Sequence, residues 1–306
     1  MRACSSQLRS SWRCCTVQLA SRRSFATAET FHQMEHRNWE KAAAAYNKGW
    51  GPLTSQCIPE MLSSLQCSSS SKLLDVATGP GFVAEAAAKT NAEVIALDFS
   101  AQMLEIAKQR MDPALSSSIQ FVEGDAAALP FEEGTFDCIA CNFGVLHLPD
   151  ADAFFQEAAR VLKPGGRLAF TVWAQPPKSQ AFDLILGAVS RQGNPNVTLP
   201  EGPPIFLFSN SEESKQRLSA AGLQFRDAKL VDQRWVLEAE DMYIAFRDGT
   251  GRTQALLLAQ SEEELAAVKA DFIKSALDFR SASSGKVDVA MPTVLTIAEK
   301  VIKVTS

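Results

Sequence analysis

Between residues 72 and 173 the chain alternates short apolar runs with segments whose apolar residues recur every three or four positions. The apolar runs have the length and composition of buried strands and lie at 72–78, 93–98, 119–125, 136–143 and 166–173. The amphipathic segments near 82–90, 100–110 and 151–162 predict helices, and the last begins beside a capping aspartate. Strands that alternate with helices predict an α/β fold with a doubly wound, mostly parallel sheet, whose carboxyl strand ends share one edge.

The segments on either side of this region follow a looser pattern. Residues 29–66 are expected to be helical, with an interruption at Gly-Trp-Gly-Pro (49–52), and the serines at 68–71 read as a linker. After residue 173 we expect helices at 179–192 and 210–221, a strand at 223–237, helical structure over 239–280 and one closing strand. We therefore divide the chain into an amino-terminal helical segment (26–68) and a domain (69–306) with a helical insertion at 238–286.

The first 28 residues have a different composition from the rest of the chain. They contain five Arg, six Ser and no acidic residue, and Leu8, Trp12, Cys15 and Leu19 recur at helical spacing. This composition is typical of an organellar transit peptide, and RRSFATA resembles a mitochondrial processing site. We expect a transit peptide at residues 1–25 and a location in the mitochondrial matrix. A plastid location and a disordered basic tail are the alternatives.

Charge and hydropathy narrow the classes of partner. Loss of residues 1–25 with their five arginines takes the formal charge from −5 to −10. An acidic protein of this kind has no general electrostatic attraction for nucleic acids or anionic membranes, so we expect no nucleic-acid partner. The chain has no run approaching the roughly 18 apolar residues of a membrane helix, so we expect no transmembrane segment. The oligomeric state is left open.

Two short segments have the residue types and spacing of known metal-binding or redox motifs. Cys138 and Cys141 form C-x-x-C inside a predicted strand, where side chains three positions apart face opposite sides of the sheet. We interpret them as buried thiols. His32-Gln-Met-Glu-His36 spells a zinc-peptidase pattern, but only one further histidine, His147, is present in the chain. We therefore expect no metal site.

A glycine turn follows the first predicted strand in the segment LLDVATGPGF. Gly79 and Gly81 would present backbone N–H groups and a helix start to a ligand, and they fit the dinucleotide fingerprint. Asp75 precedes the turn, and Asp98 ends the second strand, where a carboxylate can accept hydrogen bonds from ribose hydroxyls. These residues alone are equally compatible with NAD and S-adenosylmethionine.

Later segments distinguish the two cofactors. LDVATGPG, ALDFSAQMLEIAK, FVEGDAAALPFEEGTFDCIACNFGVLHLPD and RVLKPGGRLAF occur in this order. Together they resemble class I S-adenosylmethionine-dependent methyltransferases, and most of all the ubiquinone and menaquinone C-methyltransferases. The resemblance covers residues 70–175 most strongly. It implies a Rossmann-like seven-stranded sheet with an antiparallel last strand and S-adenosyl-L-methionine as cofactor.

The chain also departs from the quinone methyltransferases. The strand after KPGG ends in FTVWAQP, where that family resembles a form ending in Glu-x-Ser. The family's amino-terminal Tyr-Asp-x-Met-Asn pattern is only faintly matched by YNKGWGPLT. For these reasons the sequence does not assign a quinone as the acceptor.

The resemblance implies a set of cofactor contacts at the strand ends. The predicted cofactor-binding residues are Asp75, Ala77, Thr78, Gly79, Gly81, Asp98, Phe99, Met103, Asp125, Ala126, Asn142 and Phe143. The first strand and its turn would hold the methionine end, and the second strand end would hold the ribose and adenosine. The third strand end would meet the adenine, and the fourth would flank the methyl group. Ala77 stands where family members often have glycine.

A candidate catalytic residue and an acceptor class complete the expectation. His147 follows the fourth strand, where an imidazole could take a proton from a methyl acceptor; packing or loop bonding is its alternative role. The flanking segments carry aromatic residues that favour a small, apolar or aromatic acceptor, namely Trp50, Phe206, Phe208, Trp235, Tyr243 and Phe246. We expect a methyltransferase acting on an O, N or C atom. The alternatives are a non-catalytic cofactor-binding assembly factor in mitochondria and an NAD-dependent oxidoreductase.

Overall fold

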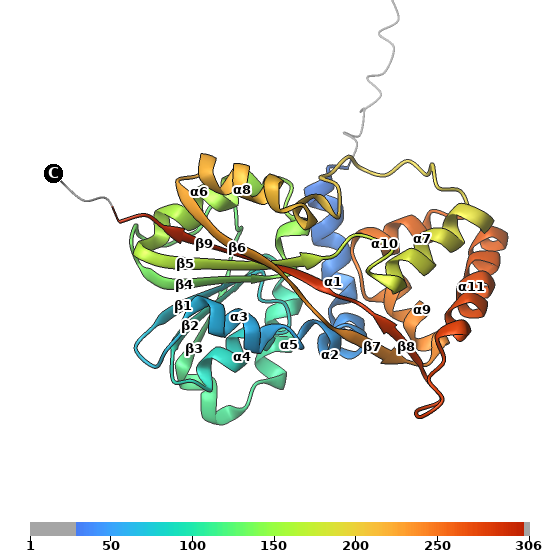
Figure 1. Cartoon of the computed structure of the whole chain (residues 1–306), viewed down its shortest axis with the longest axis horizontal. Coiled ribbons are helices and arrows are strands. Elements are labelled where there is room, and N and C mark those ends of the chain that lie inside the picture. Colours follow the sequence, from blue (N-terminus) through green and yellow to red (C-terminus); the bar gives the residue numbers. More distant parts are fainter. Residues whose placement is uncertain (1–28, 303–306) are drawn as a thin grey trace, which may run out of the picture.

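The computed structural model describes residues 29–302 (Figure 1). The predicted transit peptide lies outside the described residues. Helices lie on both faces of a central sheet, and further helices gather beyond its carboxyl edge, which faces helix α1 (Phe31–Gly49). No helix within 29–302 has the length and apolar character that a membrane span requires.

Seven strands of the described region form one sheet in the order β3-β2-β1-β4-β5-β9-β6. They are β1 (Lys72–Val76), β2 (Glu93–Asp98), β3 (Ile119–Glu123), β4 (Phe136–Asn142), β5 (Leu162–Trp173), β6 (Leu223–Val231) and β9 (Thr293–Lys300). Strands β1 to β5 pair in parallel, whereas β9 is antiparallel to both of its neighbours, β5 and β6. The predicted doubly wound sheet with an antiparallel last strand is confirmed.

The two faces of the sheet bury separate cores because strand side chains alternate. Leu74 and Ile139 belong to a core shared with α6 (Ala151–Val161) and α8 (Ser211–Ala220). Leu73 and Ala140 belong to another, shared with α3 (Ile58–Leu65) and α4 (Phe82–Ala88). Helix α5 (Ala101–Arg110) and the short 3-10 turns η1 (Pro113–Ser118) and η2 (Val145–His147) complete the connections between parallel strands.

The alternation also separates the two cysteines of the C-x-x-C motif. Cys138 lies in the core with α3 and α4, and Cys141 lies in the core with α6 and α8. All four described cysteines are free thiols, and all are buried except Cys67, which is half-buried. Among the described residues no group of three or more His, Cys, Asp or Glu side chains is placed to hold a metal ion.

Two predicted strands are each divided in two, which the sequence pattern did not indicate. The run 223–237 forms β6 and then β7 (Arg234–Leu237), and the closing run forms β8 (Val287–Ala290) and then β9. β7 and β8 pair with each other in a separate two-stranded ribbon. Both chains bend at the same level, where Met291 donates its N–H to the carbonyl of Gln233 and Pro292 has no N–H for a ladder.

Gly165 and Gly166 of the KPGG segment lie at a bulge within β5. Phe136 pairs with Leu162 and Cys138 pairs with Arg167, so β5 carries extra residues at this point. Gly165 has a φ of +79°, which favours glycine. The strand therefore begins before the run 166–173 expected from the sequence and includes these glycines.

The remaining helices form a layer beyond the carboxyl edge of the sheet. They are α2 (Gly51–Thr54), α7 (Gln180–Gln192), α9 (Ala239–Asp248), α10 (Arg252–Leu258) and α11 (Glu262–Ala276), with η3 (Leu207–Ser209) and η4 (Leu277–Phe279). Helix α1 packs against α5 on the sheet side and against α9 and α10 on the other side (Figure 1). α1 therefore spans the space between the sheet edge and this helical layer.

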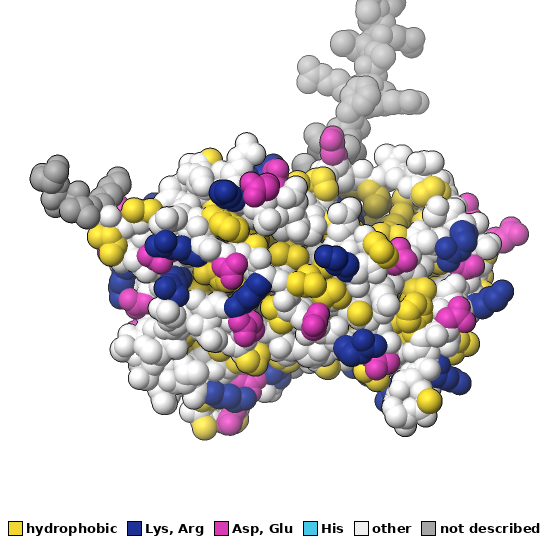
Figure 2. All heavy atoms as spheres, viewed as in Figure 1, with side chains coloured by type: hydrophobic (Ala, Val, Ile, Leu, Met, Phe, Trp, Pro, Cys, Tyr) yellow, Lys and Arg dark blue, Asp and Glu magenta, His cyan; other side chains and the backbone are white. Residues whose placement is uncertain are grey.

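On the face drawn in Figure 2, acidic and basic side chains alternate and are interspersed with apolar ones. Several are paired across elements, including Arg226 with Glu299 and Arg234 with Asp288. Exposed pairs of this kind contribute little to stability, with a typical range of about 0–1 kcal/mol.

Candidate cofactor and acceptor site

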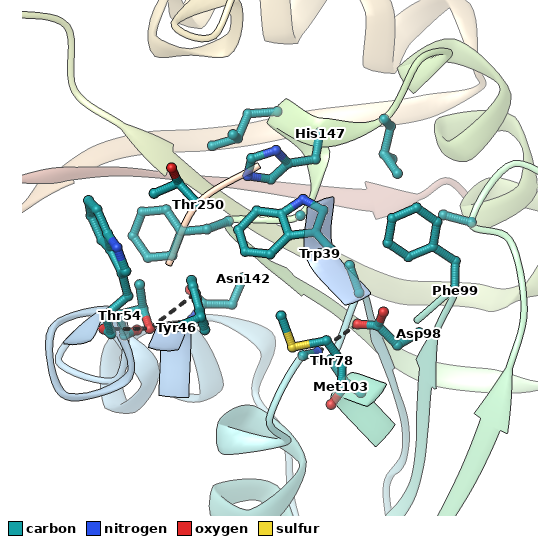
Figure 3. A pocket seen from close by; sticks show the side chains of 18 of the residues that line it. Trp39, Tyr46, Thr54, Thr78, Asp98, Phe99, Met103, Asn142, His147 and Thr250 are labelled. Atoms are coloured by element: carbon teal, nitrogen blue, oxygen red, sulfur yellow. Dashed lines mark hydrogen bonds between the residues drawn. The ribbon is translucent and has the colours of Figure 1, made fainter. Parts of the chain in front are cut away.

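A cavity with about 1250 Å³ of empty space, its open mouth included, lies between the carboxyl ends of the strands and α1 (Figure 3). The predicted cofactor-binding residues line it, with the exception of Gly81. Gly81 instead begins α4 with a φ of +77°, and a Cβ there would lie 3.1 Å from the Cβ of Ala107 on α5. In this structure Gly81 allows the close packing of α4 on α5, and its predicted contact with the cofactor stays a prediction.

Asp75 occupies the end of β1 with only 1% of its surface exposed. Its Oδ2 accepts hydrogen bonds from Thr78 Oγ1 at 2.6 Å and from the N–H of Ala84 at 3.0 Å. Its Oδ1 is buried without a partner among the described residues. Burial raises the pKa of this carboxyl to about 7. An unpaired carboxylate oxygen beside the turn fits a cationic group such as the ammonium of a methionine tail.

The turn after β1 has two residues lining the cavity with positive φ, Ala77 and Gly79, both at +53°. This left-handed conformation is unfavourable for alanine, which explains why glycine suits position 77. A Cβ on the neighbouring Gly144 would lie 2.6 Å from the Cβ of Ala77, so the turn after β1 and the segment after β4 approach each other closely there. The hydroxyl of Thr78 is directed to Asp75, to which it donates a hydrogen bond. Residues 77–79 of the turn line the cavity.

Asp98 joins this turn to the start of the next helix. Its two oxygens accept from the N–H of Gly79 at 2.7 Å and from the N–H of Ser100 at 2.9 Å. Burial raises the pKa of Asp98 to about 6. Each carboxylate oxygen has a second lone pair, so the group can still accept hydrogen bonds from ribose hydroxyls. Asp98 lies in the cavity wall between Thr78 and Phe99 (Figure 3).

Phe99 and Met103 form the adenosine side of the wall predicted from the sequence. Phe99 is half-buried, and the imidazoles of His32 and His36 meet its ring edge-on, with centroids 5.9 and 5.3 Å away. These two histidines of the H-x-x-E-H motif therefore contact an aromatic residue of the cavity. The amino-terminal turns of α1 therefore lie beside Phe99, at the predicted adenosine end of the cavity.

Asp125 and Ala126 stand at the mouth of the cavity after β3. Asp125 is exposed, and its Oδ1 accepts from the N–H of Ala127 at 2.9 Å. Ala126 is buried beside it. The placement is compatible with the predicted contact to an adenine edge and face, and that contact stays a prediction.

Asn142 links the amino-terminal segment to the sheet. Its Nδ2 donates to the carbonyl of Thr54 at 3.0 Å, and its Oδ1 accepts from Thr171 Oγ1 at 2.6 Å and from the Cys57 thiol at 3.3 Å. The amide is thus engaged by protein groups. Its contribution in this structure is to fix α2 against β4, while its side chain remains part of the cavity wall.

Phe143, the residue after β4, has a φ of +56°, a strained conformation for an aromatic residue. Its N–H donates to Thr171 Oγ1 at 2.9 Å, and its ring stacks on Trp173 with centroids 4.0 Å apart. These contacts hold the ring in the cavity wall. They place flat aromatic surface at the fourth strand end, where the methyl group is expected.

The acceptor side of the cavity is mostly aromatic, but through other residues than those expected. Of the six aromatic residues singled out in the sequence, Trp50 lines the cavity. The other five pack in the core behind it, and they are Phe206, Phe208, Trp235, Tyr243 and Phe246. They were candidates because of composition alone, and composition does not distinguish a core side chain from a cavity wall.

Several wall residues were not identified from the sequence, namely Trp39, Tyr46, Thr250 and Arg252. The helical spacing of Glu35, Trp39 and Tyr46 in the segment 29–66 was the available signal. Tyr46 donates to Thr54 Oγ1 at 3.4 Å, and burial raises its pKa to about 12, so it remains a protonated phenol.

His147 lies in the cavity wall on η2, as the sequence led us to expect. Its Nδ1 is 2.8 Å from Oε2 of Glu35, which lies on α1 and is 1% exposed. Its ring meets Trp39 edge-on with centroids 4.8 Å apart (Figure 3). The structure thus places the candidate base in the cavity and gives it a partner that the sequence did not reveal.

The geometry of Asp98 predicts that Asp98→Ala weakens S-adenosylmethionine binding about 10- to 100-fold, since hydrogen bonds to charged groups contribute about 1.5–3 kcal/mol. Calorimetric titration measures the affinity, and circular dichroism with a melting curve checks that the fold is retained. Asp112→Ala is the matched control, because this exposed aspartate also accepts a backbone N–H but lies outside the cavity. Equal affinity in the wild type and Asp98→Ala would overturn the ribose placement.

The raised pKa of Asp75 predicts pH-dependent cofactor affinity. A carboxyl with a pKa of about 7 is mostly ionised at pH 8 and mostly protonated at pH 6, and only the ionised form attracts an ammonium group. We expect affinity for S-adenosylmethionine to fall about tenfold from pH 8 to pH 6. The asparagine variant Asp75→Asn should bind more weakly and with a flatter dependence. A pH dependence as steep in the variant as in the wild type would contradict the assignment.

Comparison with known protein families agrees with the site. Residues 74–170 match the family model described as a methyltransferase domain. The demethylmenaquinone methyltransferase of Staphylococcus carnosus is 31% identical over 67% of this chain and 82% of its own length. That of Thermus thermophilus is 34% identical over 51% of this chain and 75% of its own length. The Lactococcus lactis enzyme of the same name is 34% identical, and the match spans 62% of its length.

Solved structures share the fold at low sequence identity. The [4+2]-cyclase SpnF is 19% identical, with a TM-score of 0.58 over 90% of this chain and 98% of its own. A phosphoethanolamine N-methyltransferase of Haemonchus contortus, solved with S-adenosylhomocysteine, is also 19% identical, with a TM-score of 0.52 over 90% of this chain and 61% of its own. The sheet order, the strand-end carboxylates and these relatives agree, and they confirm the predicted family and cofactor. This chain belongs to the class I S-adenosylmethionine-dependent methyltransferases, in the group that contains the demethylmenaquinone methyltransferases.

Proposed function

We propose that this chain transfers a methyl group from S-adenosylmethionine to a ring carbon of a small hydroxylated aromatic acceptor of the quinol type. The observation that carries the proposal is the aromatic wall that continues from the cofactor end of the cavity. Phe143 and Trp173 stack there, and Trp39, Tyr46 and Trp50 face the same space. Flat aromatic surfaces at stacking distance favour a flat aromatic ligand.

The names of the relatives support the same acceptor class. They are demethylmenaquinone methyltransferases, and a demethylmenaquinone carries a flat bicyclic ring. The sequence departures from the quinone group fall in β5 and in the amino-terminal segment, and both of these line the cavity through Trp173 and Trp50. The proposal therefore names the ring chemistry of the acceptor and leaves its substituents open.

The residues of the chain provide what such a reaction requires. When bound, S-adenosylmethionine supplies an electrophilic methyl group and becomes S-adenosylhomocysteine, and one proton leaves the acceptor for each methyl transferred. Asp75 and Asp98 would hold the two ends of the cofactor. The apolar wall excludes water from the reacting atoms. His147 lies in the same cavity and can take the proton.

Reduced and oxidised forms of one ring system provide the test. We expect the protein to methylate 1,4-naphthoquinols or benzoquinols, detected by mass spectrometry as a gain of one methylene group, and not to methylate the corresponding quinones. A quinol has electron-rich ring carbons that can attack the methyl group, and a quinone does not. Asp98→Ala serves as the control with weakened cofactor binding, and its turnover at low S-adenosylmethionine concentration should fall accordingly. Cofactor binding with no product from any quinol, phenol or amine would favour the non-catalytic assembly factor.

We also propose that the protein acts in the mitochondrial matrix. The Arg-rich, Ser-rich and acid-free composition of residues 1–25 supports this location. A fluorescent protein fused after residue 30 should enter mitochondria, and replacement of Arg22 and Arg23 by alanine should reduce its import. Sequencing of the mature amino terminus should give a start at residue 26. Accumulation of the fusion in plastids or in the cytosol would contradict the proposal.

A further inference from the structure

Glu35 is a buried carboxylate that reaches the acceptor side of the cavity from α1. Its Oε2 accepts two hydrogen bonds, from Trp39 Nε1 at 2.9 Å and from His147 Nδ1 at 2.8 Å. Its Oε1 is buried and has no hydrogen-bond partner among the described residues. His147 is also its only ion-pair partner within the described part of the chain. An ordinary packing role does not call for a charge in this position.

The surroundings of Glu35 keep water away from it. Gly251 packs so closely that a Cβ there would lie 2.8 Å from Glu35 Oε2 and 3.0 Å from Trp39 Nε1. The carbonyl of Gly251 in turn accepts from Asn38 Nδ2 at 3.1 Å. A carboxylate enclosed in this way is unfavourable for folding unless its charge is compensated. The compensation available among the described residues consists of the hydrogen bonds of Trp39 and His147 and the positive charge of Arg252, which lines the same cavity and interacts electrostatically with Glu35.

The hydrogen bond determines the tautomer of His147. An ionised carboxylate oxygen can only accept hydrogen bonds, so the proton of a neutral His147 must be on Nδ1. The lone pair is then on Nε2, which has no hydrogen bond within the described chain, while the ring lines the cavity. Trp39 contacts the ring edge-on and is itself held by Glu35 (Figure 3). The base nitrogen is thus presented to the acceptor with its orientation fixed.

We propose that Glu35 is a positioning residue for His147, and that this pair removes the hydroxyl proton of the acceptor. The inference rests on the proposed function and adds the residue that orients and activates the base. The acceptor O–H bond breaks as an N–H bond forms at His147 Nε2, and the electron pair stays on the acceptor oxygen. Delocalisation of this pair makes the adjacent ring carbon nucleophilic, and that carbon takes the methyl group. His147 then returns its proton to the ring oxygen and, neutral again, takes the hydrogen of the methylated ring carbon as a proton. This proton is the one net proton of the reaction, and it passes from His147 to solvent when the product leaves.

The negative charge of Glu35 stabilises the imidazolium that forms in this step. This function can be separated from hydrogen bonding, because one oxygen atom of Glu35 accepts both bonds. In Glu35→Gln the amide oxygen can take the place of Oε2 and accept from both Trp39 and His147 without the charge. In Glu35→Leu both bonds are lost as well. Comparison of the two variants therefore distinguishes the charge from the orientation.

Kinetics with a quinol acceptor give the first measurement. We expect Glu35→Gln to lower kcat about tenfold or more, with KM for S-adenosylmethionine unchanged and a melting temperature equal to or above that of the wild type. Glu35→Leu and His147→Gln should lower kcat about 100-fold or more, as is typical for loss of a general base. A merely structural role predicts the opposite pattern, with lower stability and an unchanged kcat.

Glu157→Gln is the matched control. Glu157 accepts from the N–H of Leu129 at 2.8 Å and pairs with Arg160, but it lies on α6 and does not line the cavity. Its substitution should lower the melting temperature and leave kcat within twofold of the wild type. The contrast between the two Glu→Gln variants shows whether loss of a hydrogen-bonded carboxylate is enough to reduce turnover.

Nuclear magnetic resonance gives a measurement that needs no acceptor. Long-range proton–nitrogen spectra of histidine-labelled protein distinguish the two neutral tautomers, and three histidines are simple to assign with His147→Gln. We expect the Nδ1–H form of His147 in the wild type and in Glu35→Gln, and a mixture of tautomers in Glu35→Leu. The Nε2–H form in the wild type would overturn the inference.

The outcomes separate this inference from the proposed function. Turnover by the wild type with kcat unchanged in Glu35→Gln would overturn the role of the Glu35 charge and leave the methyltransferase proposal intact. No turnover of any quinol by the wild type would instead overturn the acceptor class. In that case the tautomer spectra alone decide the pairing, and loss of the Nδ1–H form in Glu35→Leu supports it.

Discussion

The site depends on the burial of carboxylates at strand ends, where no side chain of residues 29–302 forms an ion pair with them. Asp75 and Asp98 are nearly inaccessible to solvent, and burial raises the pKa of each. Asp98 also holds the turn after β1 to the start of α5 through two backbone N–H groups. That link connects the glycine turn to the segment that carries Phe99 and Met103, the predicted adenosine side of the cavity. A cofactor with a cationic tail and a ribose supplies the partners that the protein leaves out.

The amino-terminal segment is an integral part of this arrangement. Helix α1 packs on α5, α9 and α10, and Asn142 fixes the following short helix against β4. The wall of the acceptor side therefore combines residues that precede β1 in the sequence with residues that follow it. The fold alone, which solved structures share at 19% identity, therefore does not define this cavity, because part of its wall comes from the amino-terminal helices.

Local sequence patterns were sufficient for the sheet and for the cofactor end. Alternating apolar runs predicted β1 to β5. The cofactor end was predictable because Asp75, the glycine turn and Asp98 lie within one short stretch of the sequence and belong to recognisable motifs. The division of the last strands depended on a shared bend at Gln233 and Met291, which no single run displays. The pairing of Glu35 with His147 joins positions separated by 112 residues. Such contacts are set by the packing of α1, and helical periodicity indicates only which side of that helix is apolar.

Helix α1 carries His32 and His36 at its cofactor side and Glu35 at its acceptor side, within little more than one turn. A helical turn is rigid, so these groups move together. One turn of α1 therefore covers both the predicted cofactor side and the acceptor side of the cavity. The position of this helix sets the distance from Glu35 to His147 and the contact of the two histidines with Phe99 together, so the two ends of the cavity share one support.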